Sequence, residues 1–356
     1  MCDRSLTWYT GIRVNDKELW VSDYKYNALF RIDKMSKEVV FVGEFPVGSD
    51  NPKELHYESF CAGTTLYFLP QHSDCISLYD MQKNEFSSIA IGDRKHGYAT
   101  IVGAYNFNDE VYWLVPRYTD MPILALSVKK NAIIEEISLN DLSDGEQGKV
   151  YEILYSCKTD SGIAFAINGT NTIVLFDSFL RTISIHKLDG IKSITGAITF
   201  YRNKLWISTD EGVSIWDIKG KNYIQLDKIQ LPSHNVIEWM GVNNDTLICV
   251  PRWRDNILMY NINNYDISQI SLNELELHSA IDERWDWRDF KMVYLENNFL
   301  ELFPLKYKEK IRIDLLTRTL QVETYSYPKG YNPFGNRITQ ENIITTVSDF
   351  VGFLVE

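Results

Sequence analysis

Short runs of alternating apolar and polar residues fill most of the chain and are separated by polar turns. In each unit, a turn rich in Asn, Asp or Gly precedes an aromatic and apolar strand. A polar turn and a second strand with alternating apolar residues follow. Alternation with a period of two is typical of a strand that buries one face. The pattern therefore predicts an all-β fold built from a repeat.

The first turn and strand of this unit can be aligned in seven copies. They are NDKELWV (15–21), GTTLYFLP (63–70), NDEVYWLVP (108–116), GTNTIVLF (169–176), RNKLWIS (202–208), NNDTLICVP (243–251) and NNFLELFP (297–304). Their average spacing is about 47 residues, which is typical of propeller blades of four strands. We expect a β-propeller of seven four-stranded blades, and a six-bladed ring is the alternative if one unit is degenerate.

The spacing also predicts the boundaries of the blades inside one propeller domain at 1–338. The expected blades cover about residues 7–46, 57–92, 100–139, 160–195, 196–232, 236–273 and 289–327. Two intervals depart from the average. The long one predicts an insertion near 138–160, and the short one predicts a stunted outer strand near 192–195 in blade four.

The last segment, 339–356, has a different pattern. Its apolar residues recur with a helical period, and Thr339 can cap the first turn. We expect a short amphipathic helix that packs on the propeller, and a helix that docks a partner is the alternative.

One unit carries a family resemblance. Tyr67-Phe68-Leu69-Pro70, followed by Tyr79-Asp80 and then Phe86, resembles a kelch repeat, in which a glycine pair, a Tyr-Asp strand and an aromatic residue follow an apolar strand. Here Pro-x replaces the glycine pair, at Pro70, Pro116, Pro251 and Pro304. The resemblance implies a kelch-like propeller and no particular function.

Composition narrows the classes of partner. A net charge of −12 disfavours nucleic acid and anionic membranes, so we expect neither as a partner. The five cysteines show no C-x-x-C spacing, which argues against a disulfide framework and a zinc site. With no apolar segment typical of a signal peptide, these features predict a cytoplasmic protein. No motif predicts a cofactor or a metal.

Two turns attract attention because they are nearly identical: VPRYTD (115–120) and VPRWRD (250–255). In a four-stranded blade, the turn between the second and third strands lies at the same end as the link to the next blade, because successive strands are antiparallel. Arg117 and Arg252 should therefore face each other across the mouth of the channel. An arginine beside an aromatic residue suits a carboxylate, a phosphate or a planar ring. The alternative is that each arginine pairs with Asp120 or Asp255 of its own turn.

This end of the propeller supplies the candidate site. The candidate ligand-binding residues are Arg117, Tyr118, Arg252, Trp253, Arg254, Trp285, Trp287, Tyr57 and His72. The candidates for general acid or base chemistry are His72, His234 and Glu238. Because both arginines are expected in exposed turns, their double replacement by Ala should leave folding intact.

These features favour a non-catalytic binding module that recognises a peptide, a protein or an anionic small ligand on this face. The alternative is a propeller lyase, epimerase or hydrolase acting there on a carboxylate-bearing substrate, such as a sugar acid or a peptide. A third possibility is a scaffold subunit that assembles through its C-terminal helix.

Overall fold

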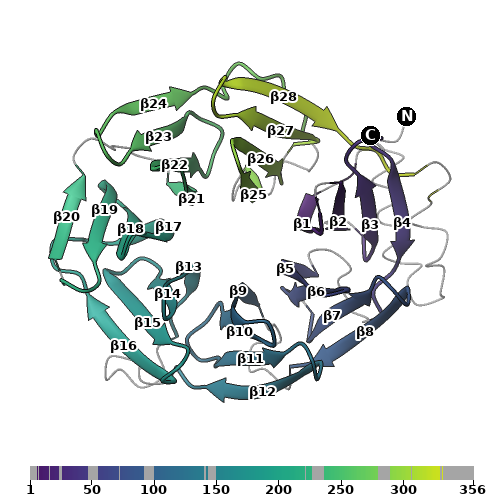
Figure 1. The fold of residues 1–356 in the computed structure, drawn as a ribbon, viewed down its shortest axis with the longest axis horizontal. Helices are drawn as coiled ribbons and strands as arrows, with labels where there is room; N and C mark the ends of the chain where they lie inside the picture. Colours follow the sequence, from purple (N-terminus) through teal and green to yellow (C-terminus); the bar gives the residue numbers. More distant parts are fainter. Residues whose placement is uncertain are drawn as a thin grey trace, which may run out of the picture.

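The computed structural model describes residues 6, 8–15, 17–23, 26–46, 55–71, 73–91, 100–139, 142, 150–220, 222–226, 236–279, 289–305, 307–328 and 331. Within these residues, the strands form seven separate four-stranded antiparallel sheets, arranged as blades around a ring (Figure 1). This part of the chain contains no α-helix. The predicted seven-bladed all-β propeller is confirmed, and the predicted helix at 339–356 lies outside the described residues.

Each blade consists of four strands that are consecutive in the chain. Blade 1 contains β1 (Trp8–Arg13), β2 (Glu18–Asp23), β3 (Leu29–Asp33) and β4 (Val39–Gly43). Blade 2 contains β5 (His56–Ala62), β6 (Thr65–Pro70), β7 (Cys75–Asp80) and β8 (Glu85–Ala90). Blade 3 contains β9 (Ile101–Asn108), β10 (Val111–Pro116), β11 (Ile123–Ser127) and β12 (Ala132–Ile137). Blade 4 contains β13 (Ile153–Lys158), β14 (Gly162–Ile167), β15 (Thr172–Asp177) and β16 (Thr182–Lys187).

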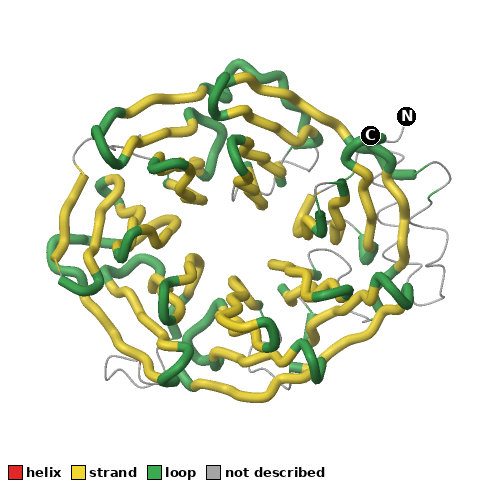
Figure 2. The backbone as a smooth tube through the Cα atoms, viewed as in Figure 1, coloured by secondary structure: helices red, strands yellow, loops and turns green. Residues whose placement is uncertain are grey.

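The remaining blades repeat this order. Blade 5 contains β17 (Ile194–Tyr201), β18 (Lys204–Thr209), β19 (Gly212–Asp217) and β20 (Asn222–Leu226). Blade 6 contains β21 (Ile237–Asn243), β22 (Thr246–Pro251), β23 (Ile257–Asn261) and β24 (Ile267–Ile270). Blade 7 contains β25 (Phe290–Glu296), β26 (Phe299–Pro304), β27 (Glu309–Asp314) and β28 (Thr319–Thr324). In every blade the first strand is innermost and the fourth is outermost, as the labels of Figure 1 show, and the tube in Figure 2 follows the same ring of strands.

Blade 4 corrects the alignment of the repeat. The segment GTNTIVLF, which was aligned with the second strands of the other blades, contains the third strand of blade 4, β15. The second strand is β14, whose sequence GIAFAI is fully buried. The outer strand is β16, so the stunted outer strand expected near 192–195 is wrong, and those residues lead into β17. The insertion expected near 138–160 is also too long, since it includes β13. Both β14 and β15 are short apolar strands after a polar turn, so the pattern alone does not separate them.

The turns between the third and fourth strands explain the recurrent apolar-Asp pair. In blade 1, Asp33 Oδ1 accepts hydrogen bonds from the backbone N–H groups of Met35 and Ser36, both at 2.8 Å. Five other blades use the equivalent residue in this way: Asp80, Asp177, Asp217, Asn261 and Asp314. Backbone hydrogen bonds are the largest cause of the lowered pKa of Asp33. The recurrent apolar-Asp pair thus has a local cause, since the acidic side chain fixes a tight turn.

The hydrophobic core is divided among the blade junctions. Within the described residues, seven clusters of buried side chains each join two neighbouring blades. The cluster between blades 3 and 4, for example, packs Trp113 against Phe176, with ring centroids 4.8 Å apart. Such flat, largely apolar interfaces hold the blades together, since no described strand of one blade pairs with a strand of another.

The junction between blades 7 and 1 joins the last blade of the ring to the first, and the segment after blade 7 reaches across it, since Tyr331 packs on Phe30 and Phe41 of blade 1. No described strand of one blade joins the sheet of the other. Leu6 N donates a hydrogen bond to Tyr325 O at 2.9 Å, and Tyr327 OH donates one to Asp23 Oδ2 at 2.7 Å. Arg13 of β1 also forms an ion pair with Glu296 of β25.

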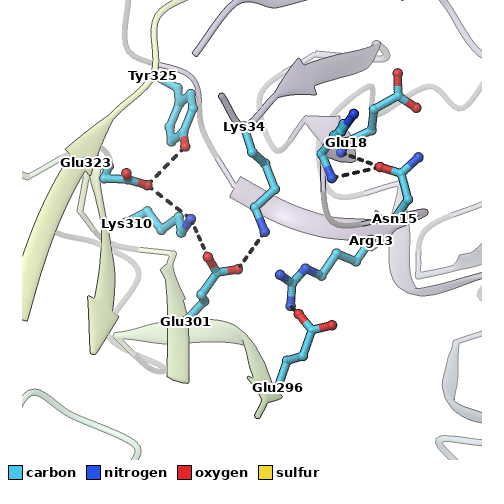
Figure 3. A network of polar contacts seen from close by, with 10 residues as sticks. Arg13, Asn15, Glu18, Lys34, Glu296, Glu301, Lys310, Glu323 and Tyr325 are labelled. Atoms are coloured by element: carbon cyan, nitrogen blue, oxygen red, sulfur yellow. Dashed lines mark hydrogen bonds and ion pairs between the residues drawn. The ribbon is translucent and has the colours of Figure 1, made fainter. Parts of the chain in front are cut away.

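A group of charged side chains, here called the closure cluster, lies at this junction; its members are Lys34, Glu301, Lys310 and Glu323 (Figure 3). Lys310 Nζ lies 2.9 Å from Glu301 Oε1 and 3.1 Å from Glu323 Oε2. Lys34 of blade 1 reaches Glu301 Oε2 at 3.6 Å. Burial acts to raise the pKa of Glu301, but the positive charges of Lys310 and Lys34 outweigh it and hold that pKa below its ordinary value.

Candidate functional site

The backbone of the two VPR turns explains why they recur. The N–H of Arg117 donates to Thr100 O, and that of Arg252 donates to Val236 O, at the entrance of their own blades. The carbonyl of Arg117 accepts from Ile153 N at 2.6 Å, and that of Arg252 accepts from Asp289 N at 2.8 Å. Each turn therefore joins its own blade to the next one. We call this end of the ring, which carries these turns and the links between blades, the link face.

The side chain of Arg117 is held by the next blade. Its Nε lies 2.7 Å from Glu152 Oε1, and its Nη2 lies 2.6 Å from the same oxygen. Asn168 Nδ2 donates to the other oxygen of Glu152 at 3.1 Å. The guanidinium also lies over the ring of Tyr118, 5.6 Å from its centroid. The expectation of a freely exposed arginine is wrong, because the Arg117 side chain is only 16% exposed.

Arg252 belongs to a different arrangement, here called the inner cluster, whose members are Tyr155, Glu238 and Arg252. Arg252 Nε donates to Glu238 Oε2 at 3.0 Å, and Arg252 Nη2 donates to Tyr155 OH at 2.6 Å. Tyr155 OH in turn donates to Glu238 Oε2 at 2.9 Å. Burial acts to lower the pKa of Arg252, but the phenol and the carboxylate raise it above its ordinary value. Arg252 is therefore a permanent cation.

The inner cluster spans two blades that are not neighbours. Tyr155 lies on β13 of blade 4 and Glu238 on β21 of blade 6, so their contact passes the inner side of blade 5 (Figure 1). Gly196 on β17 helps to bring blades 5 and 6 together, since a Cβ atom there would lie 2.4 Å from Ile237 O. The first strands are close enough here for one tyrosine to reach across a whole blade.

Further polar side chains gather near the ring centre. The carboxylate of Glu58 in blade 2 adds to burial in raising the pKa of Tyr105 in blade 3 and of Tyr294 in blade 7. Tyr105 OH lies 2.9 Å from Ser156 Oγ, and Tyr294 OH donates a hydrogen bond to Gly11 O. The innermost strands of several blades thus point carboxyl and phenol groups toward one region.

The structure also describes three other predicted site residues, Trp253, Arg254 and Tyr57. Tyr57 does not lie where the sequence suggested. Trp253 is partly buried, and the Arg252 guanidinium lies 5.8 Å from its ring centroid. Arg254 donates to Leu275 O at 3.1 Å, and its guanidinium lies over the ring of Tyr307. Tyr57 is only 8% exposed and packs in the core between blades 3 and 4, so it is no part of an open rim.

Four predicted site residues lie outside the described residues. They are His72, His234, Trp285 and Trp287. Their roles in binding or catalysis stay predictions.

Two further histidines of the link end have structural partners. His56 is 1% exposed, and its ring nitrogens lie 2.8 Å from Ser22 Oγ and 3.0 Å from Ser77 Oγ. Burial lowers the pKa of His56 to about 3, so this ring is neutral at neutral pH. His278 Nδ1 lies 2.7 Å from Glu309 Oε1. Both described histidines at this end are thus held by partners within the protein.

Sequence reasoning missed Glu152 and Tyr155 because both fell inside the expected insertion. With GIAFAI as the second strand, ILYSCK becomes the first strand of blade 4. Tyr155 then aligns with Trp239 of blade 6, since both pair with the residue that precedes the last position of the second strand. The apolar run GIAFAI was the signal in the sequence that could have revealed the correct second strand.

Among the described residues, no group of three or more His, Cys, Asp or Glu side chains is arranged to hold a metal ion. In the same part of the chain, no helix has the length and apolar character needed to span a membrane.

The two arginine sites differ from the anion-binding rim expected from sequence. Glu152 and Glu238 already neutralise Arg117 and Arg252, and neither arginine pairs mainly with an aspartate of its own turn. A neutral pair of a guanidinium and a carboxylate offers hydrogen-bond donors and acceptors side by side. Such a surface suits a ligand that carries both kinds of group, such as a peptide, better than a simple anion.

Comparisons with known proteins reveal the fold but no family. No protein-family model matches the chain, and no curated protein matches it. A streptogramin B lyase structure has a TM-score of 0.64 and 14% identity, covering 91% of this chain and 96% of that chain. A catalytically inactive virginiamycin B lyase from Staphylococcus aureus, solved with quinupristin, has a TM-score of 0.63 and 13% identity, covering 86% of this chain and 95% of that one.

A second kind of neighbour is YCF48 bound to D1 peptide, with a TM-score of 0.62, 7% identity and coverage of 92% and 95%. At these identities the likeness concerns the fold alone. The neighbours are propellers that include a lyase and a peptide-binding protein, and the kelch resemblance has no counterpart among them. The chain is thus a seven-bladed β-propeller similar in architecture to proteins of both functional classes.

Proposed function

We propose that this protein is a non-catalytic binding module that takes a peptide or a segment of a protein on the link face, over the inner cluster. The observation that carries the proposal is the set of contacts among Tyr155, Glu238 and Arg252. It places a fixed cation, a carboxylate and a phenol at the inner edge of the ring, on blades 4 and 6. The contacts of Tyr155 with Glu238 and Arg252 are not part of the strand pairing within any one blade.

Repetition within the molecule supports this proposal. The blades share their backbone contacts at the link face, but among the described residues only blade 6 adds an arginine that reaches a tyrosine two blades away. In a repeat protein, a side chain that departs from its equivalents is free to serve recognition rather than the fold. Partly exposed Trp253 and Tyr118 beside the arginines add aromatic contact area of the kind found at binding hot spots.

A lyase, epimerase or hydrolase is the second candidate. Glu238, the candidate general base, lies on an innermost strand within hydrogen-bond distance of Tyr155, which favours proton transfer at this place. Against it, Glu238 Oε2 is already occupied by two donors, one of them a permanent cation. These two donors leave less of the carboxylate open to a substrate, so we rank binding first.

The proposal is tested by a thermal-shift screen of the purified chain against a library of short peptides, sugar acids and acidic metabolites. A ligand of the folded state raises the melting temperature by mass action. We expect peptide hits that Arg252→Lys weakens and that Lys129→Met, an exposed change away from the inner cluster, leaves intact. No peptide hit, or peptide hits unaffected by Arg252→Lys, would contradict the proposal.

A follow-up separates binding from catalysis. Each hit is incubated with the wild type and with Glu238→Gln, and the products are followed by mass spectrometry. Turnover by the wild type that Glu238→Gln abolishes would establish the second candidate. The cytoplasmic location stays a prediction.

A further inference from the structure

The innermost strand of blade 2 brings a carboxylate to the level of the inner cluster. Glu58 on β5 pairs with Leu69, the residue before the last position of the second strand. Tyr155 of the inner cluster holds the same position in blade 4, opposite Ala166. Equivalent positions of a repeat direct their side chains the same way, and Tyr155 extends past the next blade to blade 6. Glu58, which is partly buried, therefore extends from blade 2 past blade 3 toward the ring centre.

Blade 3 brings a phenol to this level of the ring. Its equivalent residue is Gly103, and a Cβ atom there would lie 2.8 Å from Cε2 of Tyr105 and 2.7 Å from Ser156 Oγ. The missing side chain lets the ring of Tyr105 lie over Gly103, where its OH is 2.9 Å from Ser156 Oγ. The glycine therefore makes space for the phenol on the inner side of blade 3.

A second phenol approaches the same carboxylate from blade 7. Tyr294 OH donates a hydrogen bond to Gly11 O of blade 1. Ser59 Oγ donates to the same carbonyl oxygen at 3.0 Å, so this phenol lies beside the residue that follows Glu58. Burial raises the pKa of Tyr294 most, and the charge of Glu58 adds to it, as it does for Tyr105. One carboxylate thus lies near two phenols that come from different blades.

The charges of the two ends of the ring also differ. Among the described residues in the turns and links of the link face, Asp and Glu outnumber Lys and Arg. In the described loops at the opposite end, Lys and Arg outnumber Asp and Glu. Of the link-face arginines, Arg117 and Arg252 are already neutralised by carboxylates of the protein. The link face therefore carries an excess of negative charge, which attracts a basic ligand.

We propose that the peptide bound on the link face carries a lysine or arginine side chain, which enters the ring centre and pairs with Glu58. The phenol rings of Tyr105 and Tyr294 flank this cation, and the face of an aromatic ring attracts a cation as well. A carboxylate at the same position of the peptide is repelled by Glu58. This inference rests on the proposed function, because the same peptide contacts the inner cluster, and it names the side chain that the site selects.

The test uses blocked glycine peptides with one central lysine, norleucine or glutamate, and the full chain with methyl-labelled methionine. Met292 on β25 reports on the ring centre, because it holds the position equivalent to Glu58 and its methyl carbon lies 3.4 Å from a Cβ placed on Gly11. Met35, which is 81% exposed at the opposite end, is the control. We expect the lysine peptide to cause a saturable NMR shift of Met292 that added salt weakens, and the glutamate peptide to cause none.

The matched variants remove one negative charge at either end of the ring. Glu58→Gln keeps the shape of the side chain and an oxygen that can accept from Ser59 N. It should weaken binding of the lysine peptide about tenfold and leave binding of the norleucine peptide unchanged. Glu110→Gln, at a 66% exposed side chain of the opposite end, should leave both unchanged.

Three results would overturn the inference: no saturable shift of Met292, equal binding of the lysine and norleucine peptides, or binding of the lysine peptide that survives Glu58→Gln. The failure of the proposed function looks different. Peptide hits that Arg252→Lys weakens, without any preference for a basic residue, would overturn this inference and leave the proposed function standing. The absence of binding by every peptide would overturn both.

Discussion

The closure cluster and the inner cluster use the same chemistry in different surroundings. Both combine a cation, a carboxylate and a nearby tyrosine. The side chains of Lys310 and Glu301 are 2% and 4% exposed, whereas those of Arg252 and Glu238 are 24% and 11% exposed. The buried set lies where the ring closes, and the more open set lies near the ring centre. A charged cluster thus indicates a binding site only where a ligand can reach it.

The largest effect is expected in the closure cluster. Lys310→Met should lower the free energy of unfolding by about 3–5 kcal/mol, because it removes the buried cation that Glu301 and Glu323 share and leaves them only the longer contacts with Lys34 and Lys37. Urea unfolding measures it, with Lys129→Met, at a 74% exposed lysine, as the control that changes little. Adding Glu301→Leu and Glu323→Gln to Lys310→Met should restore much of the loss. A loss as small as that of the control would remove the contrast between the clusters.

A smaller loss is expected in the inner cluster. Arg252→Ala should cost about 1–3 kcal/mol, since it removes charge-assisted hydrogen bonds that water can partly replace. The same unfolding measurement applies, and Arg117→Ala should behave similarly because Glu152 loses its partner. This result would replace the expectation from sequence that both changes are harmless. Unfolding curves that coincide with the wild type would support free, exposed arginines instead.

Acid should reduce the contribution of the closure cluster to stability, through protonation of Glu301. The pKa of Glu301 is lower in the folded protein than its ordinary value, so its contribution to stability is full above about pH 4.5. That contribution is lost as the pH falls through the folded pKa. Between pH 5 and 3, the unfolding free energy of Glu301→Gln should therefore fall less steeply than that of the wild type. Parallel curves would show that Glu301 does not titrate with folding.

The smallest change in stability is expected for Tyr155→Phe, at about 0.5–1.5 kcal/mol, because only one hydroxyl is removed. Its effect on the peptide hits of the link face should be larger than its effect on stability, since the phenol holds Arg252 and Glu238 in place. Calorimetric titration of one hit measures the first and urea unfolding the second. Unchanged affinity for the peptide would show that Tyr155 is a structural residue. The inner cluster would then serve stability, as the closure cluster does.

Much of the fold could be predicted from local pattern, and the candidate site only in part. The position of Arg117 and Arg252 on one face followed from strand direction alone. Their partners did not, because Glu152 is 35 residues from Arg117 in the chain, and Tyr155 is 97 residues from Arg252. Tyr57 shows the opposite error: an aromatic residue at a blade link was expected on a rim and packs in the core.

The sequence by itself determined the repeat, the seven blades and the tight turns after each apolar-Asp pair, because these depend on interactions between residues close in the chain. The tertiary structure decided which charges meet. Closing the ring brings Lys34 to Glu301, and the approach of the innermost strands brings Tyr155 to Glu238. Those contacts depend on the angle between blades and on small residues such as Gly196, and no periodic pattern encodes either.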